Sequence, residues 1–310
     1  MSFLETLLSG NSVKERNAKK ACAIAIVVTA LILVISIIAL VICQVVDMTA
    51  NVGNDNDEGN EQEPVQIGEL VSKQLSESAI YSGNLLTLNA NARYQGDVDV
   101  VNLQKRTDRP TTESGENSYS VLKADREKYH ATEETAAALN KMLKAFYEAK
   151  KDDNIVISGA YNINEVATQD AVYSSGEAVA LSYFHDYANN GINDQRSISK
   201  VDTYNWIYAN AHKYGFVAVS GNSNIFRYVG VTHATAIKTR GLSLDNYLAQ
   251  LKNATPEQPM TLNANGTRVA YYCPVTDVQV PKNYSYEISG NNVDGVIVTV
   301  DLSKVTAPQE

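Results

Sequence analysis

The chain has 310 residues and a formal net charge of −9 at pH 7, which is long enough for at least one domain with its own hydrophobic core. The acidic balance argues against a nucleic-acid partner, because phosphate-binding surfaces need an excess of Lys and Arg. Of the cysteines, Cys22 and Cys43 lie near the N-terminus and only Cys273 lies beyond them. An intramolecular disulfide within the large C-terminal part is therefore excluded.

The N-terminal 46 residues have the pattern of a membrane anchor. Residues 1–20 carry the basic residues Lys14, Arg16, Lys19 and Lys20, and the run from Ala21 to Cys43 is apolar and uncharged. At about 1.5 Å per residue, a helix over this run spans the roughly 30 Å hydrocarbon core of a bilayer. A cleaved signal peptide usually has a shorter apolar region, of about 7–15 residues. We therefore predict a transmembrane helix at 21–46.

The distribution of basic residues predicts the orientation of this anchor. They precede the span, and the next one in the chain is Lys73. The positive-inside rule then places residues 1–20 in the cytoplasm and the C-terminal part outside the cell. Residues 47–75 are rich in Asp, Glu, Asn and Gly, and have too few apolar side chains to form a core, so we predict an acidic, disordered tether. The expected localisation is a single-pass protein of the cell membrane.

The first predicted elements after the tether are short strands and one long helix. Residues 83–89 alternate as a strand does, and residues 98–103 predict a second short strand. The clearest helix covers residues 132–149, where Thr132 is suited to cap the N-terminus. Its core positions follow helical spacing and are Leu139, Met142, Leu143 and Phe146. An apolar strand at 154–157 then leads into Ser158-Gly159-Ala160-Tyr161.

The second half of the chain changes from helices to strands. Helices are predicted over residues 200–213, over 233–239 and from Ser243 onward. Short strands follow at 268–272, 278–280, 284–288 and 296–300, with a turn at 289–292. The fold class is therefore α+β, a small antiparallel sheet with packed helices at 76–255. Residues 256–310 are predicted to form a C-terminal β appendage.

Two stretches carry a resemblance to a known family. Residues 171–181 read Ala-Val-Tyr-Ser-Ser-Gly-Glu-Ala-Val-Ala-Leu, and residues 222–230 read Asn-Ser-Asn-Ile-Phe-Arg-Tyr-Val-Gly. They resemble the motifs Ser-x-His-x-x-Gly-x-Ala-x-Asp and Glu-x-x-His-Phe-Arg-Tyr-Val-Gly of the VanY-type D-alanyl-D-alanine carboxypeptidases. Gly176, Ala178 and residues 226–230 match the framework of these motifs. The resemblance implies a zinc-peptidase fold over residues 83–252, with weaker similarity at 259–303.

The positions that carry the chemistry of the family do not match. Aligned on the framework residues, the three zinc ligands fall on Tyr173, Ala180 and Ile225, and the catalytic glutamate falls on Asn222. Alanine and isoleucine have no lone pair for a metal, and a phenol with a pKa near about 10 is mostly protonated at neutral pH. An asparagine amide cannot act as a general base. The resemblance therefore implies a family member without catalytic residues, metal or other cofactor.

Other residues near the motifs remain candidates for binding a ligand. They are Ser158, Tyr161, Ser175 and Arg227, and Arg227 could instead form a salt bridge in the core. A metal site rebuilt from His185 and Asp186 is disfavoured, because neighbouring residues of a strand point to opposite faces. Ser197 and Lys200 match the Ser-x-x-Lys motif of serine enzymes that act on the same substrates. The spacings to the later motifs are too short for a transpeptidase, so we interpret this match as chance.

These observations predict a membrane-anchored extracellular pseudoenzyme. It would bind cell-wall peptide or another protein of the envelope without hydrolysing it. One alternative is an active zinc D-alanyl-D-alanine carboxypeptidase that uses a metal set not apparent in the sequence. The other is a purely structural module of the envelope.

Overall fold

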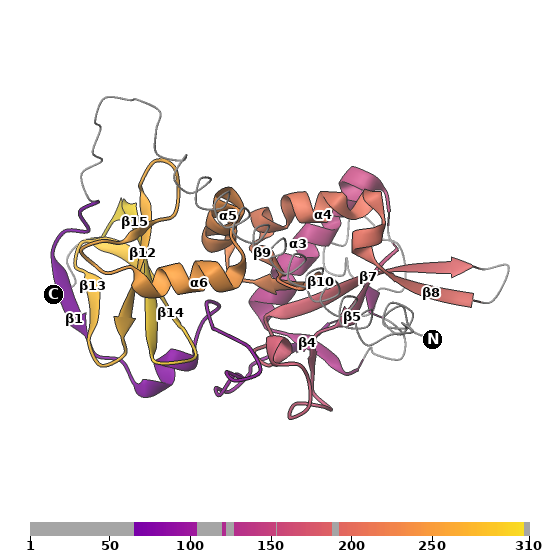
Figure 1. Ribbon diagram of the computed structural model, residues 1–310, viewed down its shortest axis with the longest axis horizontal. Helices are drawn as coiled ribbons and strands as arrows, with labels where there is room; N and C mark the ends of the chain where they lie inside the picture. The colour runs from indigo at the N-terminus through magenta and orange to yellow at the C-terminus, as the bar shows by residue number, and fades with distance from the viewer. Residues whose placement is uncertain (1–64, 104–119, 122–126, 153, 188–191, 307–310) are drawn as a thin grey trace, which may run out of the picture. The chain divides into compact units, whose positions relative to one another are not determined.

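The computed structural model describes residues 65–103, 120–121, 127–152, 154–187 and 192–306 (Figure 1). The predicted cytoplasmic tail, the predicted span at 21–46 and most of the predicted tether lie outside the described residues. Among the described residues, no helix has both the length and the apolar character needed to cross a membrane. Residues 63–310 form one compact unit, and the elements below all belong to it.

A six-stranded sheet forms the centre of this unit. Its main path runs β3 (Ser120–Val121), β5 (Ile155–Gly159), β7 (Ala178–Tyr187), β10 (Asn222–Tyr228) and β9 (Phe216–Val219), and β8 (Ile192–Ser197) pairs with β7. Only the β3–β5 pair is parallel, and the other pairs are antiparallel. The motif at 171–181 thus leads into β7, and the motif at 222–230 forms β10 beside it.

Helix α3 (Glu133–Lys150) forms as the sequence predicts. The Thr132 side chain caps it by accepting a hydrogen bond from the Thr135 backbone amide, and Leu139, Met142 and Phe146 are buried. They pack with residues of β5, β7 and β10 in one apolar core. A smaller antiparallel sheet joins β2 (Val101–Asn102), β4 (Tyr129–Ala131) and β6 (Tyr161–Asn162).

The predicted helix over residues 200–213 is not continuous. The structure has the 3₁₀ turns η5 (Ile198–Lys200) and η6 (Asp202–Tyr204), helix α4 (Asn205–Asn210), and a further 3₁₀ turn η7 (Ala211–Tyr214). Tyr204, Ile207 and Ala211 are nevertheless buried at helical spacing. Burial of this face against the core is therefore retained while the backbone tightens into 3₁₀ turns at both ends.

Helices α5 (Val231–Arg240) and α6 (Leu244–Asn253) follow the central sheet. Both were predicted, and the Ser243 side chain caps α6 by accepting a hydrogen bond from the Asn246 amide. Ile237, Tyr247 and Leu251 pack in a second apolar cluster with Leu85 and Ile297. Helix α6 also lies beside β12 of the C-terminal sheet, so this cluster connects elements from three separate parts of the sequence.

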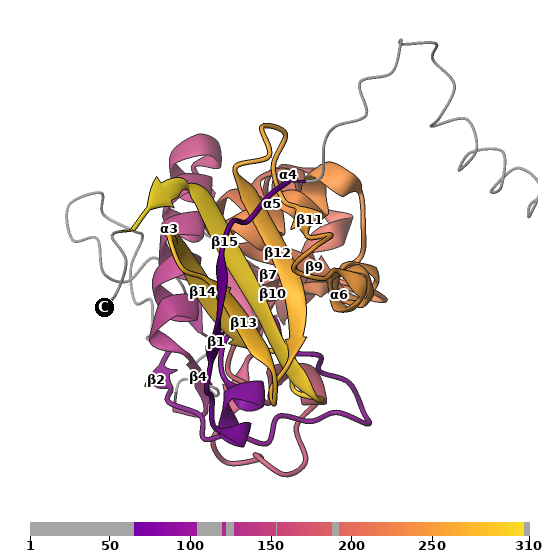
Figure 2. The same ribbon diagram turned by 90° about the vertical axis from the view of Figure 1, so that its left-hand side faces the viewer.

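The predicted C-terminal strands are confirmed as a four-stranded antiparallel sheet (Figure 2). Its order is β11 (Met260–Thr261), β12 (Arg268–Pro274), β15 (Gly295–Val305) and β14 (Tyr284–Gly290). Strand β13 (Val278–Pro281) instead pairs with β1 (Leu70–Lys73). The predicted tether was therefore too long, because four of its last residues form a strand. Ile67, which precedes β1, is buried among residues of β12, β13 and β15.

The predicted strand at 83–89 is wrong. A short 3₁₀ turn, η2 (Glu77–Tyr81), precedes this segment, which is extended but belongs to no sheet. Leu85 and Leu86 are both buried despite being neighbours. The Leu85 amide donates to Ser289 Oγ at 2.9 Å, and the Thr87 amide donates to the Asn291 carbonyl at 3.0 Å. Hydrogen bonds to the end of β14 and to the turn after it thus replace strand pairing.

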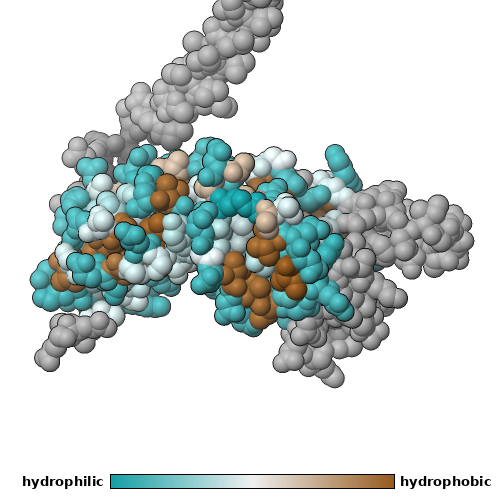
Figure 3. All heavy atoms as spheres, turned by 90° about the horizontal axis from the view of Figure 1, so that it is seen from below, coloured by the Kyte–Doolittle hydropathy of each residue, from teal (hydrophilic) through white to brown (hydrophobic). Residues whose placement is uncertain are grey.

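On the face shown in Figure 3, polar residues surround a few separate apolar patches. The large apolar side chains that are exposed among the described residues are Val71, Ile163, Val166, Val231, Val293 and Val305.

Candidate functional site

The three positions that the resemblance assigns to zinc ligands lie together. Tyr173 ends the 3₁₀ turn η4 (Ala171–Tyr173), and Ile225 of β10 is the direct antiparallel partner of Ala180 of β7. On the other side of β7, Ala180 is paired with Gly159 of β5. A Cβ atom placed on Gly159 would lie 2.9 Å from the Tyr173 hydroxyl and 3.1 Å from Ala180 Cβ. Strand register thus brings Ala180 and Ile225 together, and the turn η4 places Tyr173 beside them.

The chemistry of this place is apolar. Val172, Ala178, Ala180 and Ile225 form a buried cluster against which Tyr173 packs. Tyr173 has the only side-chain oxygen among the three ligand positions, and burial raises the pKa of its phenol further above the ordinary value. Its neutral form is therefore favoured, and a neutral phenol is a poor zinc ligand. The residues present do not fit a zinc ion.

The remaining described residues do not supply a replacement set. No group of three or more His, Cys, Asp or Glu side chains within them is arranged to hold a metal ion. Asn222, which the resemblance aligns with the catalytic glutamate, is exposed at the start of β10. Its side-chain oxygen accepts a hydrogen bond from the Asn224 amide at 3.2 Å. It is paired with Val219, which packs on the edge of the apolar cluster.

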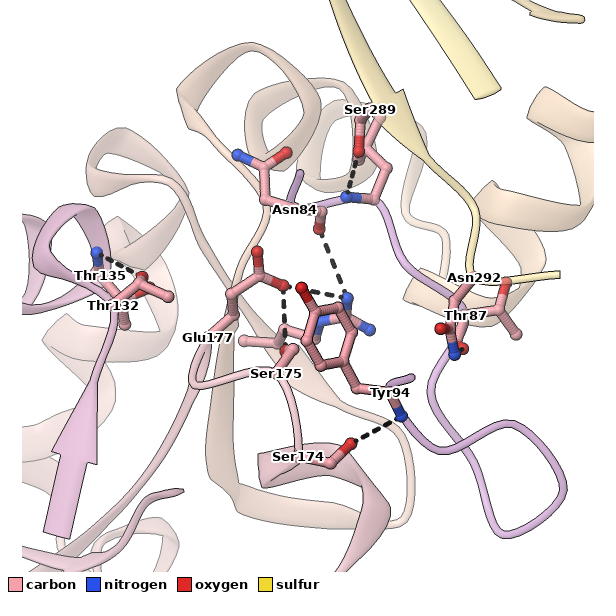
Figure 4. Close-up of polar contacts among 12 residues, drawn as sticks. Asn84, Thr87, Tyr94, Thr132, Thr135, Ser174, Ser175, Glu177, Ser289 and Asn292 are labelled. Carbon is pink, nitrogen blue, oxygen red and sulfur yellow. Dashed lines mark hydrogen bonds and ion pairs between the residues drawn. The ribbon is translucent and has the colours of Figure 1, made fainter. Parts of the chain in front are cut away.

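The polar centre of the site is a buried ion pair that the sequence did not reveal. Arg227 Nη2 lies 3.3 Å from Glu177 Oε2, and the two side chains are 3% and 9% exposed. Ser175 Oγ donates to the same carboxylate oxygen at 3.2 Å, and Arg227 Nη2 contacts the Asn84 carbonyl at 3.5 Å (Figure 4). The only available signal was an acidic residue inside an otherwise apolar motif, at a position the family pattern leaves unspecified.

Burial controls the electrostatics of this pair. It raises the pKa of Glu177 to about 7, although the charge of Arg227 and the bond from Ser175 act in the opposite direction. Burial also lowers the pKa of Arg227, against the effect of the Glu177 charge. Arg227 Nε has no hydrogen-bond partner among the described residues. The pair is thus desolvated and only partly satisfied.

The sequence-based candidates occupy different environments. Ser175 and Arg227 both contact the Glu177 carboxylate. For Arg227 this contact is the core salt bridge that the sequence left open as an alternative to ligand binding. Ser158 lies on β5, where its hydroxyl accepts a hydrogen bond from Ser182 Oγ at 2.7 Å. Tyr161 is buried on β6 and paired with His130 of β4. Ser158 and Tyr161 thus lie outside the hydrogen-bonded group of Ser175, Glu177 and Arg227.

Tyr94 lies beside the ion pair in Figure 4. Its backbone amide donates to Ser174 Oγ at 3.1 Å, and burial and the nearby Glu177 charge raise the pKa of its phenol. The segment that carries it is also held by Asn292, whose side-chain amide donates to the carbonyls of Thr87, Ala92 and Arg93. One wall of the site is therefore formed by residues N-terminal to the central sheet.

Comparisons with known proteins agree with this fold. No family model matches the chain. A D-alanyl-D-alanine carboxypeptidase from Enterococcus faecium is 29% identical over 252 residues, which cover 74% of this chain and 78% of that protein. The crystal structure of the vancomycin-resistance D,D-dipeptidase VanXYg, in complex with a D-Ala-D-Ala phosphinate analog, matches 76% of this chain and 100% of that one. Its TM-score is 0.55 at 21% identity.

The sequence match extends over most of both proteins and the structural match shows a common fold. That fold is the small antiparallel sheet with packed helices that the sequence predicted. The chain therefore shares the fold of VanXYg and is similar in sequence to a D-alanyl-D-alanine carboxypeptidase over most of its length.

Proposed function

We propose that this chain is a membrane-anchored, extracellular member of the VanY-like family that binds cell-wall peptide, or a protein of the envelope, without hydrolysing it. The observation that carries the proposal is the apolar cluster at the three ligand positions. Hydrolysis by a zinc peptidase requires about three ligands with lone pairs and an open position for water. A single neutral phenol among alanine and isoleucine side chains does not meet that requirement.

The relatives indicate which ligand to test first. One is named for removing D-alanine, and the other was solved with an analog of D-Ala-D-Ala. A peptide that ends in D-Ala-D-Ala is therefore the first candidate. Ser158, Tyr161, Ser175 and Arg227 remain its candidate contacts. The Arg227 guanidinium would have to exchange part of its bond to Glu177 for a peptide carboxylate.

The decisive experiment measures metal content, activity and binding on the same preparation. The full chain is purified, its zinc content is determined, and D-alanine release from a pentapeptide is compared with that of the Enterococcus faecium relative. We expect no stoichiometric zinc and no release, together with retention of the chain on purified sacculi. Zinc at one equivalent, with D-alanine release that a chelator abolishes, would refute the proposal.

Two other functions have specific support. The sequence identity to a carboxypeptidase favours an active zinc enzyme with an unrecognised ligand set, and the activity measurement tests this directly. The hydrogen-bonded link between the C-terminal sheet and the 83–97 segment is compatible with a structural module of the envelope. Such a module would be inactive and would also fail to bind sacculi or the pentapeptide.

The anchor and domain boundaries are part of the same proposal. The apolar run at 21–46 is the proposed membrane span, and residues 47 to about 64 are the proposed tether. After alkaline carbonate extraction the chain should stay with the membrane fraction. In intact cells, a protease added outside should remove an epitope at the C-terminus and leave one at the N-terminus. Release by carbonate would contradict the anchor.

A further inference from the structure

A cavity of about 350 Å³ lies between helix α5, strand β9 and the turn η7. Phe226 of β10 lines it, whereas its neighbour Ile225 belongs to the apolar cluster of the degenerate site. Successive side chains of a strand point to opposite faces of the sheet. The cavity is therefore on the other face of the central sheet from the site described above.

The walls of the cavity are those of a pocket for a small hydrophobic molecule. Phe216, Phe226 and Ala234 at its base are buried, and the rings of Tyr208 and Phe226 pack with their centroids 5.5 Å apart. Ala218 and Lys238 at its edge are exposed, so the cavity reaches the surface. An apolar cavity of about 150 Å³ can hold benzene, so this one has room for an aromatic ring with a short chain.

One buried polar atom on the wall of this cavity has no partner. His212 lines the cavity, and its Nδ1 atom is buried without a hydrogen bond among the described residues. Burial lowers the pKa of His212, and the charges of Lys213 and Lys238 lower it further. The imidazole is therefore neutral at pH 7 and can supply one N–H donor. A buried donor or acceptor without a partner is unfavourable, so the site gains from a ligand that satisfies it.

The charge beside this histidine is positive. Lys213 donates to Asn210 Oδ1 at 2.8 Å, and Lys238 contacts the Tyr208 carbonyl at 3.5 Å. Neither lysine forms an ion pair with a described acidic residue. Lys238 lines the cavity and has no carboxylate partner among the described residues, so its ammonium group favours an anionic group on the ligand.

We propose that this cavity binds a small hydrophobic monocarboxylate. Its apolar body would pack against Phe216, Phe226 and Ala234, and its carboxylate would accept hydrogen bonds from His212 and Lys238. The site is separate from the proposed peptide-binding site and does not depend on it.

The test compares an acid with its amide on the full chain. 3-Phenylpropanoate and 3-phenylpropanamide have the same apolar body and differ in charge, and their affinities are measured by isothermal titration calorimetry. We expect the acid to bind at least about tenfold more tightly than the amide, a difference of the size expected for a charge-assisted contact. Lys238→Met, which keeps a long apolar stem, should lower the affinity for the acid by about tenfold and leave that for the amide unchanged.

Two further variants locate the binding. Ala234→Leu adds side-chain volume inside the cavity and should abolish binding of both compounds while the chain keeps its melting temperature within a few degrees. Lys304→Met, an exposed lysine of the C-terminal sheet, serves as the matched control and should change neither affinity. Equal affinities for acid and amide, unchanged binding by Ala234→Leu, or no binding at all would each overturn the proposal.

If Ala234→Leu fails to fold, a crystal structure with 3-phenylpropanoate replaces it. The acid bound against Phe226 with its carboxylate at His212 supports the site. An ordered water as the only partner of Nδ1, with the cavity otherwise empty, refutes it.

Discussion

At the scale of single residues, the Glu177–Arg227 pair is the most consequential feature. The sequence left Arg227 open between a ligand contact and a salt bridge in the core, and gave no reason to choose Glu177 as its partner. The two are 50 residues apart in the chain and meet because β7 and β10 pair with Arg227 opposite Ala178. The residue before Ala178 is then close enough to reach the guanidinium.

Breaking this pair should be costly. Arg227→Met leaves the Glu177 carboxylate buried without its counter-charge, so we expect the free energy of unfolding to fall by about 3–5 kcal/mol. Adding Glu177→Gln should restore part of the loss, because the buried charge is then gone. Urea-induced unfolding measures both. Lys252→Met, which removes one partner of the half-exposed Lys252–Asp294 pair, should cost less than about 1 kcal/mol. Equal losses in the two single variants would contradict this account.

His233 predicts how stability depends on pH. It is buried between Tyr247 and Thr299, with Nδ1 2.7 Å from the Tyr247 hydroxyl and Nε2 2.9 Å from Thr299 Oγ1. Burial lowers its pKa from 6.5 to about 4. Because the folded-state pKa lies below the unfolded one, the contribution of the neutral ring is complete above pH 6.5 and lost as the pH falls through 4.

We therefore expect the free energy of unfolding to decrease by on the order of 3 kcal/mol between pH 7 and pH 4 from this residue. The measurement is urea unfolding at several pH values, for the wild type and His233→Gln. The difference in stability between the two proteins should shrink as the pH falls. A difference that stays constant over this range would show that His233 does not titrate with a lowered pKa.

At the scale of elements, the register of β5, β7 and β10 decides the nature of the site. The pairing of Ile225 with Ala180, and of Ala180 with Gly159, sets where two of the positions assigned to zinc ligands lie, whatever their side chains are. The backbone positions of these residues therefore do not depend on whether their side chains can bind a metal. Side-chain changes alone should then be enough to create a metal site.

The variant Tyr173→His/Ala180→Asp/Ile225→His tests this separation. Three polar groups placed in a buried apolar cluster should lower the melting temperature of the metal-free protein, since each costs roughly 1–3 kcal/mol. Zinc should then raise it, because only the folded state brings the three ligands together. Thermal unfolding with and without zinc is the measurement, and the variant without Ile225→His is the control. No response to zinc would mean that the register does not present these positions to a common ion.

At the scale of the whole molecule, the compact unit is connected by contacts between distant parts of the sequence. Strand β1 pairs with β13, and Leu85 packs with residues of α5, α6 and β15. The segment N-terminal to the central sheet is therefore part of the same unit as the C-terminal sheet, and the predicted boundary at residue 76 removes structure that this unit needs.

Two truncations measure the contribution of β1. A chain that begins at residue 65 keeps β1 and the buried Ile67, whereas one that begins at residue 76 loses both. We expect the shorter chain to be less stable by at least about 2 kcal/mol, which is the typical contribution of one buried isoleucine side chain. Urea unfolding of the two gives the difference. Equal stabilities would show that β1 and Ile67 contribute nothing to the free energy of unfolding.

Local patterns in the sequence determined several elements of this protein. Helix α3 was predictable because its cap, its acidic first turn and its apolar spacing all lie within one short stretch. The C-terminal strands were predictable because alternating residues and strong turn signals mark them. Over residues 83–89 the same reasoning failed, since Leu85 and Leu86 are both buried although they are neighbours, and the Leu85 amide is bound by Ser289 of β14, some 200 residues later.

That alanine and isoleucine at two of the positions assigned to zinc ligands offer no lone pair could be read from the sequence, because this is a property of the side chains themselves. Which residues surround these positions was decided by the tertiary structure. Strand register paired Ala180 with Ile225 and brought Glu177 to Arg227, and the turn η4 placed Tyr173 beside them. In η7, the packing left His212 Nδ1 without a hydrogen-bond partner among the described residues, beside a cavity. Such contacts depend on which strands pair and which faces meet, and those are set by the packing of the whole unit.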